Sequence, residues 1–424
     1  MPGRRGSAMF QTTQHIPRWR AICKKLFLLS ALALFFLLPL QSDPSASIFA
    51  AVLLGGCAIG KLSFPSKLSR YALVAFLGYA VVVLIASMQS PGAMGKYLII
   101  PLWACAILAG IFFSRIYPDH GYRFLLATVA AILISFAIGL VQGIDSPHLW
   151  QQFRLKLFAI HPSRLALYCA VAFLFCLNAA ATTQLKRPRL VFILLMAAIG
   201  ACLYLTNTRG VILVLPVGIL CVIMTLPPVR RTWLLAVFLL CCIGSGFALW
   251  ASQDGPLSRR IISAAVDIRN DPTFRTRLPI WEVAWDSFKK APVIGHGVKV
   301  YAKHYVAYVA EHKRDWKARY GKYYDRKAKN AHSIVLGRMV EGGALGTICF
   351  LFFYGVVIVA AFRLPREQRW AAALLIFYMG IGVFDDTLFR RNDAFMFFIM
   401  GAILGLGDNM ALGRGMRQDT LATP

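Results

Sequence analysis

The sequence predicts an all-α fold, namely a polytopic helical membrane protein with about twelve transmembrane helices. Of its 424 residues, 58% are hydrophobic and only 15% are charged, and the mean hydropathy is +0.63. These values lie far outside the range of soluble globular domains. The apolar residues also gather into runs that can cross a bilayer, which requires about 20 residues per helix.

Twelve candidate spans follow from these runs: 22–40, 46–60, 71–89, 97–113, 124–143, 165–181, 190–206, 211–226, 232–250, 334–361, 370–384 and 394–407. The first span follows a basic region, as in a cleavable signal peptide. Because further spans follow it, we expect an uncleaved first transmembrane helix. We treat residues 1–424 as a single transmembrane domain, with residues 251–333 as a large loop inserted between spans 9 and 10.

The distribution of Lys and Arg predicts the orientation. With a cytoplasmic N-terminus, the cytoplasmic segments hold 21 Lys or Arg and the short outer loops hold 7. Both termini are therefore expected in the cytoplasm, and the large loop on the outer side. That loop carries 17 Lys or Arg against 8 Asp or Glu, within a chain of net charge +28. Because this charge lies beside the membrane, we expect lipid phosphates or an anionic lipid-linked substrate as its partners, and no nucleic acid.

The large loop contains two helical patterns. Residues 277–290 (RLPIWEVAWDSFKK) predict an amphipathic helix lying in the membrane interface. Residues 298–329 predict a second helical stretch with many tyrosines and ten Lys or Arg. This stretch is either a surface helix on anionic lipid head groups or a recognition surface for sugars and phosphates, and the sequence leaves both alternatives open.

Polar residues at the ends of spans are candidate site residues. Arg209 lies in a very short outer loop (LYLTNTRGVIL, 203–213), where binding to lipid phosphate is the alternative role. His332 lies at the predicted outer end of span 334–361. Deeper in that span, Glu341 is expected to pair with Arg338 at i,i+3. Gly342 and Gly346, which also lie in that span, are expected to allow close helix packing.

Three motifs follow one another along the chain. They are the Arg209-Gly210 pair, an RxxxW element (277–281) with PVIGHG after it, and AHSxxLxxxxEGGxxG from residue 331. With the layout of the spans, they resemble the O-antigen ligase superfamily of GT-C-type inner-membrane glycosyltransferases. Where many members have His-Asn, this chain has His332-Ser333. The superfamily also includes O-antigen polymerases and protein O-oligosaccharyltransferases, and the motifs do not separate these from ligases.

The resemblance implies an enzyme of lipopolysaccharide biosynthesis in the bacterial inner membrane, with its active site facing the periplasm. The expected reaction transfers O-polysaccharide from undecaprenyl pyrophosphate to the lipid A-core acceptor. Besides these two substrates, membrane lipids are the expected partners, and the oligomeric state stays open. Because the donor is already activated, the reaction requires no ATP.

This chemistry assigns roles to the candidate residues. An imidazole can accept the proton of the attacking hydroxyl, so His332 is the expected base. The outer loops contain no DxD pattern, so we expect no metal or other cofactor and assign the leaving pyrophosphate to the guanidinium groups of Arg209 and Arg277. The expected substrate-binding residues are Arg275, Arg164, His161, Trp281, Asn330 and Arg390.

A transporter of an anionic solute is the alternative from another functional class. It predicts internal pseudo-symmetry and charged or broken helices near the middle of the membrane. Apart from Arg338 and Glu341, however, the predicted spans are almost free of charge, and the polar residues gather on one side. This one-sided distribution favours chemistry on lipid-carried substrates at the membrane surface.

Overall fold

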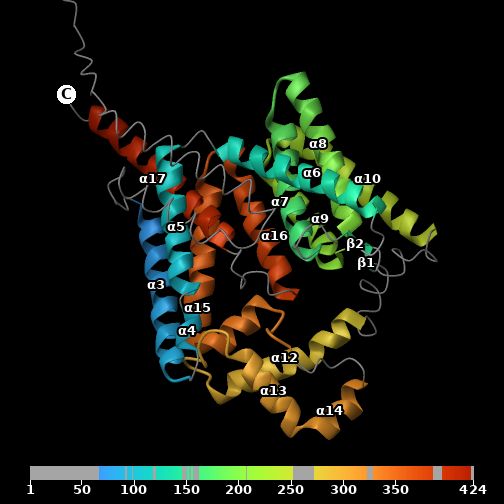
Figure 1. Ribbon diagram of the computed structural model, residues 1–424. Coiled ribbons are helices and arrows are strands. Elements are labelled where there is room, and N and C mark those ends of the chain that lie inside the picture. Colours follow the sequence, from blue (N-terminus) through green and yellow to red (C-terminus); the bar gives the residue numbers. More distant parts are fainter. Residues whose placement is uncertain are drawn as a thin grey trace, which may run out of the picture.

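The structure, a computed structural model, describes most of the chain after residue 65 (Figure 1). The described residues are 66–90, 93–97, 99–117, 121–145, 150–151, 154–155, 162–206, 208–251, 272–321, 328–384 and 394–421. The spans predicted at 22–40 and 46–60 lie outside them. Each of the ten later predicted spans corresponds to a helix.

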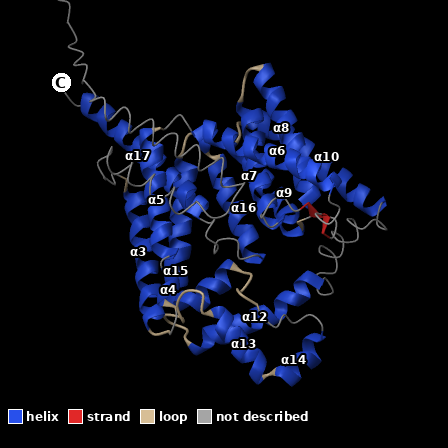
Figure 2. Cartoon of the chain, in the orientation of Figure 1, coloured by secondary structure: helices blue, strands red, loops and turns tan. Residues whose placement is uncertain are grey.

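The described part of the chain is almost entirely helical (Figure 2). One small antiparallel hairpin, β1 (Trp150–Gln151) and β2 (Arg154–Leu155), departs from the purely helical expectation. The helices are α3 (Lys67–Met88), α4 (Met94–Tyr97), α5 (Ile99–Ile116), α6 (Gly121–Asp145), α7 (Pro162–Thr182), α8 (Lys186–Thr206), α9 (Arg209–Thr225), α10 (Pro228–Ala251), α12 (Pro272–Lys290), α13 (Tyr301–Glu311), α14 (Lys313–Tyr320), α15 (Ile334–Arg363), α16 (Trp370–Phe384) and α17 (Ala394–Leu421), with a 3₁₀ turn η3 (Arg366–Gln368).

Five described helices are long and apolar enough to cross a membrane: Lys67–Met88, Ile99–Ile116, Leu165–Thr182, Lys186–Thr206 and Ile334–Arg363. Shorter apolar helices cover Leu125–Ile138, Gly210–Thr225 and Met396–Met410. The protein is therefore a polytopic membrane protein, and the total of twelve spans stays a prediction.

The membrane helices form two groups joined by α16 (Figure 1). In one group, α3 packs on α15 and α5 on α17; in the other, α7 packs on α8 and α9. Glycines permit close contact of α5 and α17, because a Cβ atom at Gly110 would lie 2.0 Å from the backbone oxygen of Phe398. Helix α16 contacts α9, α15 and α7, and so connects the two groups.

At one end of the first group, a buried carboxylate ties three helices together. Asp408 of α17 is fully buried and accepts hydrogen bonds from the Ser69 hydroxyl (2.7 Å) and the Ser66 backbone N–H (3.2 Å) at the start of α3. It also forms an ion pair with Arg115 of α5. A buried charge needs such partners to offset its desolvation, so this cluster fixes the ends of α3, α5 and α17.

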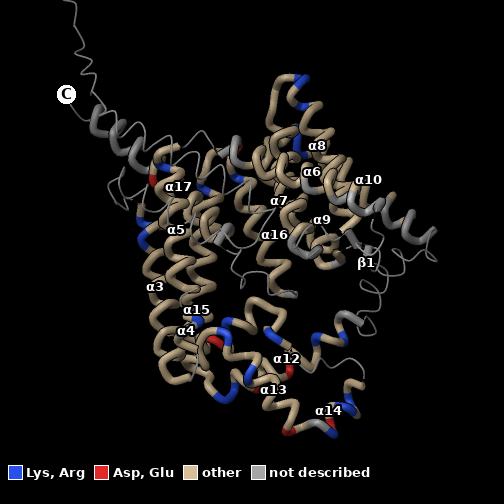
Figure 3. The backbone as a smooth tube through the Cα atoms, viewed as in Figure 1, with Lys and Arg blue, Asp and Glu red and all other residues tan. Residues whose placement is uncertain are grey.

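At the other end of the bundle lie α12, α13 and α14, which we call the loop layer (Figures 1 and 3). Its core includes Tyr301, Tyr305 and Trp316, whose exposed fractions are 4%, 0% and 0%. The expectation of an aromatic surface helix is wrong for these three residues, because they fill the space between α12, α13 and α14. Trp285 of α12 is 49% exposed and points away from that core.

Candidate functional site

A break in α15 joins the loop layer to the membrane bundle. Gly343 has φ 60° and ψ −159° inside the helix. Around it, the PVIGHG segment (292–297) pairs with the opened helix backbone. The N–H groups of His296 and Gly297 donate to the carbonyl oxygens of Val340 (2.8 Å) and Glu341 (2.9 Å). In return, the Ala344 N–H donates to the Pro292 carbonyl oxygen at 2.7 Å.

Glycines make this backbone pairing possible. A Cβ atom on Gly343 would lie 2.4 Å from the carbonyl carbon of Val293, and one on Gly295 would lie 2.5 Å from the Gly343 nitrogen. Gly297 approaches α3 in the same way, because its Cβ atom would lie 2.6 Å from the Ser87 Cα. All three have positive φ, which glycine adopts without strain. This role was not predicted from the sequence, although the glycine pairs in GHG and EGG indicate close backbone contact.

The expected ion pair between Arg338 and Glu341 is confirmed. Arg338 is 0% exposed, and its Nη1 lies 3.0 Å from the Glu341 Oε2. Its guanidinium carbon lies 5.2 to 5.3 Å from three ring centroids, those of Tyr79, Trp103 and Phe350. Such contacts offset part of the cost of burying the charge.

The Glu341 carboxylate reaches a second partner beyond this aromatic cage. Its Oε1 accepts the backbone N–H of Lys299, two residues after PVIGHG, at 3.0 Å. The pair therefore anchors the loop layer to α15. Gly342 and Gly346 face Val82 and Val83 of α3, as the expected packing role requires.

His332 lies where the two hydrophobic cores meet. The residue before it, Ala331, is buried in the core of the loop layer, and Ile334 is buried in the core of the membrane bundle. His332 itself is half-buried, with φ 47°, immediately before the Ser333 N-cap of α15. Both neighbours are fixed by packing, so the backbone that carries the imidazole is fixed as well.

Helix α16 brings the first residue of α9 to the same end of the bundle. Gly380 faces Val214 of α9, and Gly382 faces Ile334 of α15. Arg209 begins α9 about 7 Å along the helix from Val214. The backbones of Arg209 and His332 therefore both lie near the loop-layer end of α16. The structure describes Arg209 by its backbone only.

Helix α12 carries Arg275, Arg277 and Trp281 within two turns. Both arginines are half-buried and engaged in contacts. One turn after Arg277, Ile280 packs in the core that also contains Ala331, next to His332. The Trp281 Nε1 is buried and has no hydrogen-bond partner among the described residues.

The remaining predicted site residues are less fully placed. Asn330 is half-buried in the bend before His332. Arg164 lies in the first turn of α7 and is described by its backbone only. His161 and Arg390 lie outside the described residues.

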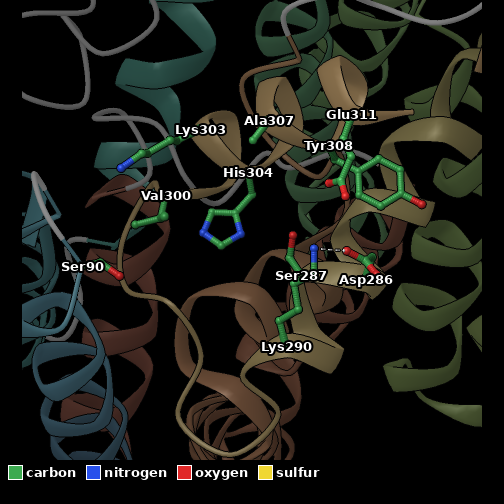
Figure 4. A pocket seen from close by; sticks show the side chains of 10 residues that line it. All are labelled: Ser90, Asp286, Ser287, Lys290, Val300, Lys303, His304, Ala307, Tyr308 and Glu311. Atoms are coloured by element: carbon green, nitrogen blue, oxygen red, sulfur yellow. Dashed lines mark ion pairs between the residues drawn. The ribbon is translucent and has the colours of Figure 1, made fainter. Parts of the chain in front are cut away.

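A polar pocket of 250 Å³ lies between α12, α13 and the end of α3 (Figure 4). The His304 ring points into it, with the Asp286–Lys290 ion pair (2.9 Å) on the α12 side. Near the pocket, the His296 Nε2 contacts the Ser287 carbonyl oxygen at 2.8 Å. Lys303 and Glu311 complete the charged lining.

Burial explains the electrostatics of the loop layer. It lowers the pKa of His304 to about 4, and the nearby His296 and Lys290 act in the same direction. Burial and the hydrogen bond to Glu282 raise the pKa of Tyr320 to about 12. At neutral pH the pocket holds a neutral imidazole beside two lysines and two carboxylates, which is a lining suited to sugar hydroxyl groups.

The described residues offer arginines and a histidine, but no cluster that would hold a metal. No group of three or more His, Cys, Asp or Glu side chains comes together among them. Two guanidinium groups can bind phosphate oxygens, and an imidazole can accept a proton near neutral pH. These are the side-chain types that displacement of a phosphate leaving group by a hydroxyl requires.

The comparison with protein families agrees with this chemistry. Residues 190–351, from α8 through the loop layer and into α15, match the family model described as O-antigen ligase. A comparison with curated proteins gives no significant match. Proteins of that family carry out glycosyl transfer in lipopolysaccharide or glycan biosynthesis, with lipid-linked glycan substrates. Residues 190–351 of this multi-pass membrane protein thus carry the sequence pattern of the O-antigen ligase family.

Proposed function

We propose that the protein is an O-antigen ligase. It transfers O-polysaccharide from undecaprenyl pyrophosphate to the lipid A-core at the periplasmic face of the inner membrane, without a metal. The observation that carries the proposal is that α16 packs on both α9 and α15, while α12 packs on α15. This packing directs the segments that carry Arg209, Arg277 and His332 toward the loop-layer end of the bundle, which supports the roles proposed for these residues.

In the proposed reaction, His332 accepts the proton of the acceptor hydroxyl. The oxygen attacks the anomeric carbon of the donor as the bond from that carbon to the phosphate oxygen breaks. The undecaprenyl pyrophosphate leaves with the electron pair of that bond. Arg209 and Arg277 hold its added negative charge, assisted by Arg275. Preorganised donors of this kind commonly lower the barrier by about 3 to 4 kcal/mol each.

The polar pocket supplies a second contact region for the glycans. It opens beside Ser90 at the end of α3, on the same side of the bundle as the loop layer. Its equal numbers of lysines and carboxylates favour hydroxyl groups over phosphate. We assign it to a sugar of the acceptor, with His304 and Glu311 as hydrogen-bonding partners.

A transfer assay with purified protein tests the proposal. Labelled undecaprenyl-linked glycan is mixed with lipid A-core, and the products are separated by mass. The expected product is glycan attached to the core, and His332→Ala should lower its rate by at least about 10²-fold. The control variant is Arg363→Gln, because Arg363 is exposed at the opposite end of α15 from His332. Longer lipid-linked chains without core attachment would instead identify a polymerase.

A further inference from the structure

A second cavity lies at the end of the bundle opposite the loop layer. It is a groove of 430 Å³ between α7, α8 and α10. Helix α8 packs on α7 and α10 packs on α9, which leaves a channel between α8 and α10 that α7 closes from behind. Its outer wall is open, because Val229 and Trp233 of α10 are 76% and 74% exposed.

The lining of this groove changes from charged to apolar along α8. Arg189 of α8 and Arg230 of α10 lie at the mouth. From Arg189 the lining continues along α8 to Ile193 and Met196, one and two turns deeper, while α7 contributes Leu177 at the matching depth. The groove thus has a cationic mouth and a hydrocarbon interior.

The two arginines are held in place at the mouth. The Arg189 Nη2 donates to the Thr183 carbonyl oxygen at 2.8 Å, and the Arg230 Nη1 donates to the Ala181 carbonyl oxygen. Both acceptors lie at the carboxyl end of α7, whose negative helix-dipole end favours cations. Each of these bonds uses one nitrogen of a guanidinium group, so other N–H groups can bind a ligand. The Arg189 Nε is buried without a hydrogen-bond partner among the described residues.

The two chain segments that flank the mouth are cationic. Segments 182–189 (TTQLKRPR) and 226–231 (LPPVRR) carry five Lys or Arg and no Asp or Glu. A zwitterionic head group would therefore place its own cation among arginines, whereas an anionic one would not. Basic pockets between membrane helices are known to select anionic head groups.

We propose that this groove binds an anionic glycerophospholipid of the leaflet opposite the loop layer. Its phosphate lies between Arg189 and Arg230, and one acyl chain lies along Leu177, Ile193 and Met196. The site is separate from the proposed transfer reaction, which takes place at the other membrane face. The lipid bridges α8 and α10, and both helices lead toward the loop-layer end.

The test uses the full chain purified in detergent. Phosphatidylglycerol and phosphatidylcholine are added in equal amounts, and bound lipid is counted by native mass spectrometry. We expect retention of phosphatidylglycerol only, and roughly 30-fold weaker retention by Arg189→Gln/Arg230→Gln. The matched control is Lys67→Gln/Arg363→Gln, which removes two exposed cations from the same membrane face on α3 and α15. It should bind like the parent protein.

A third variant tests the apolar interior of the groove independently of the two arginines. Ile193→Trp fills the apolar interior and keeps both arginines, so it should also lose the bound lipid. Equal retention of the two lipids, or unchanged retention by the groove variants, would overturn the proposal. A dimer that disappears in the Ile193→Trp variant would likewise overturn it, because the groove would then be a protein interface.

Discussion

The buried pair of Arg338 and Glu341 allows a quantitative prediction. Glu341→Gln keeps the shape of the side chain and an oxygen that can still accept the Lys299 N–H. It removes the carboxylate charge that pairs with the Arg338 guanidinium at 3.0 Å. Because Arg338 is 0% exposed, water cannot replace the lost carboxylate.

The expected loss follows from this burial. Removing one partner of a buried ion pair generally costs about 3 to 5 kcal/mol. The three aromatic rings around the guanidinium remain in the variant and each attracts the cation by up to about 2 kcal/mol. We therefore expect the lower end of that range, about 3 kcal/mol in the free energy of unfolding.

A double-mutant cycle is the appropriate assay. Unfolding of the purified protein in mixed micelles is followed for the parent, Glu341→Gln, Arg338→Met and the double variant. Methionine suits the space among Tyr79, Trp103 and Phe350, because its thioether packs well on rings. The double variant should recover most of the stability lost in each single variant. Transfer activity per folded molecule should be unchanged, because the pair anchors the fold.

Two results would refute this reasoning. A loss below about 1 kcal/mol in Glu341→Gln would mean that leaving the buried Arg338 charge without its carboxylate costs far less than is usual for a buried ion pair. A double variant that is as unstable as the single variants would mean that each residue acts through separate contacts.

Three further predictions concern the site and the loop layer. Arg277→Lys should lower transfer at least about tenfold without unfolding the protein, because an ammonium cannot form the paired bonds of a guanidinium; equal rates would reduce Arg277 to a general charge. Gly343→Ala should lower stability by about 2 kcal/mol or more, since its Cβ would lie 2.4 Å from Val293, whereas Gly355→Ala on the same helix meets nothing within 4 Å and should be neutral in thermal unfolding. His304 has a folded-state pKa of about 4 against about 6.5 when unfolded, so the unfolded state binds more protons between these values and stability should fall as pH decreases from 6.5 to 4. His304→Gln should flatten that part of the stability profile, and an unchanged slope would contradict the burial of the imidazole.

Much of the fold could be predicted because hydropathy and helix periodicity are local properties. The span expected at 165–181 became α7 (Pro162–Thr182), and the span at 370–384 became α16 with the same bounds. The i,i+3 spacing of Arg338 and Glu341 was sufficient to predict their ion pair, since a helix fixes that geometry by itself.

The candidate site was predicted only in part. The motif order indicated His332 and Arg277, and the structure puts their flanking residues Ala331 and Ile280 in one core. The order of the motifs could not indicate that α16 would lie between α9 and α15. That position depends on how Gly380 and Gly382 fit partners far away in the sequence.

The sequence by itself determined the membrane class, the helical elements and the family of residues 190–351, because apolar run length and motif spacing are written in the order of residues. Only the tertiary structure decided which aromatics are buried. In the sequence, Tyr301, Tyr305 and Trp316 stand among polar residues, as the aromatic residues of an interfacial helix do. In the structure they lie in the core of the loop layer. Burial depends on the partner that a face meets, and α12 and α14 supply that partner by folding back on α13. In the same way, the tertiary structure alone showed that Gly295 and Gly343 are the points where two backbones touch.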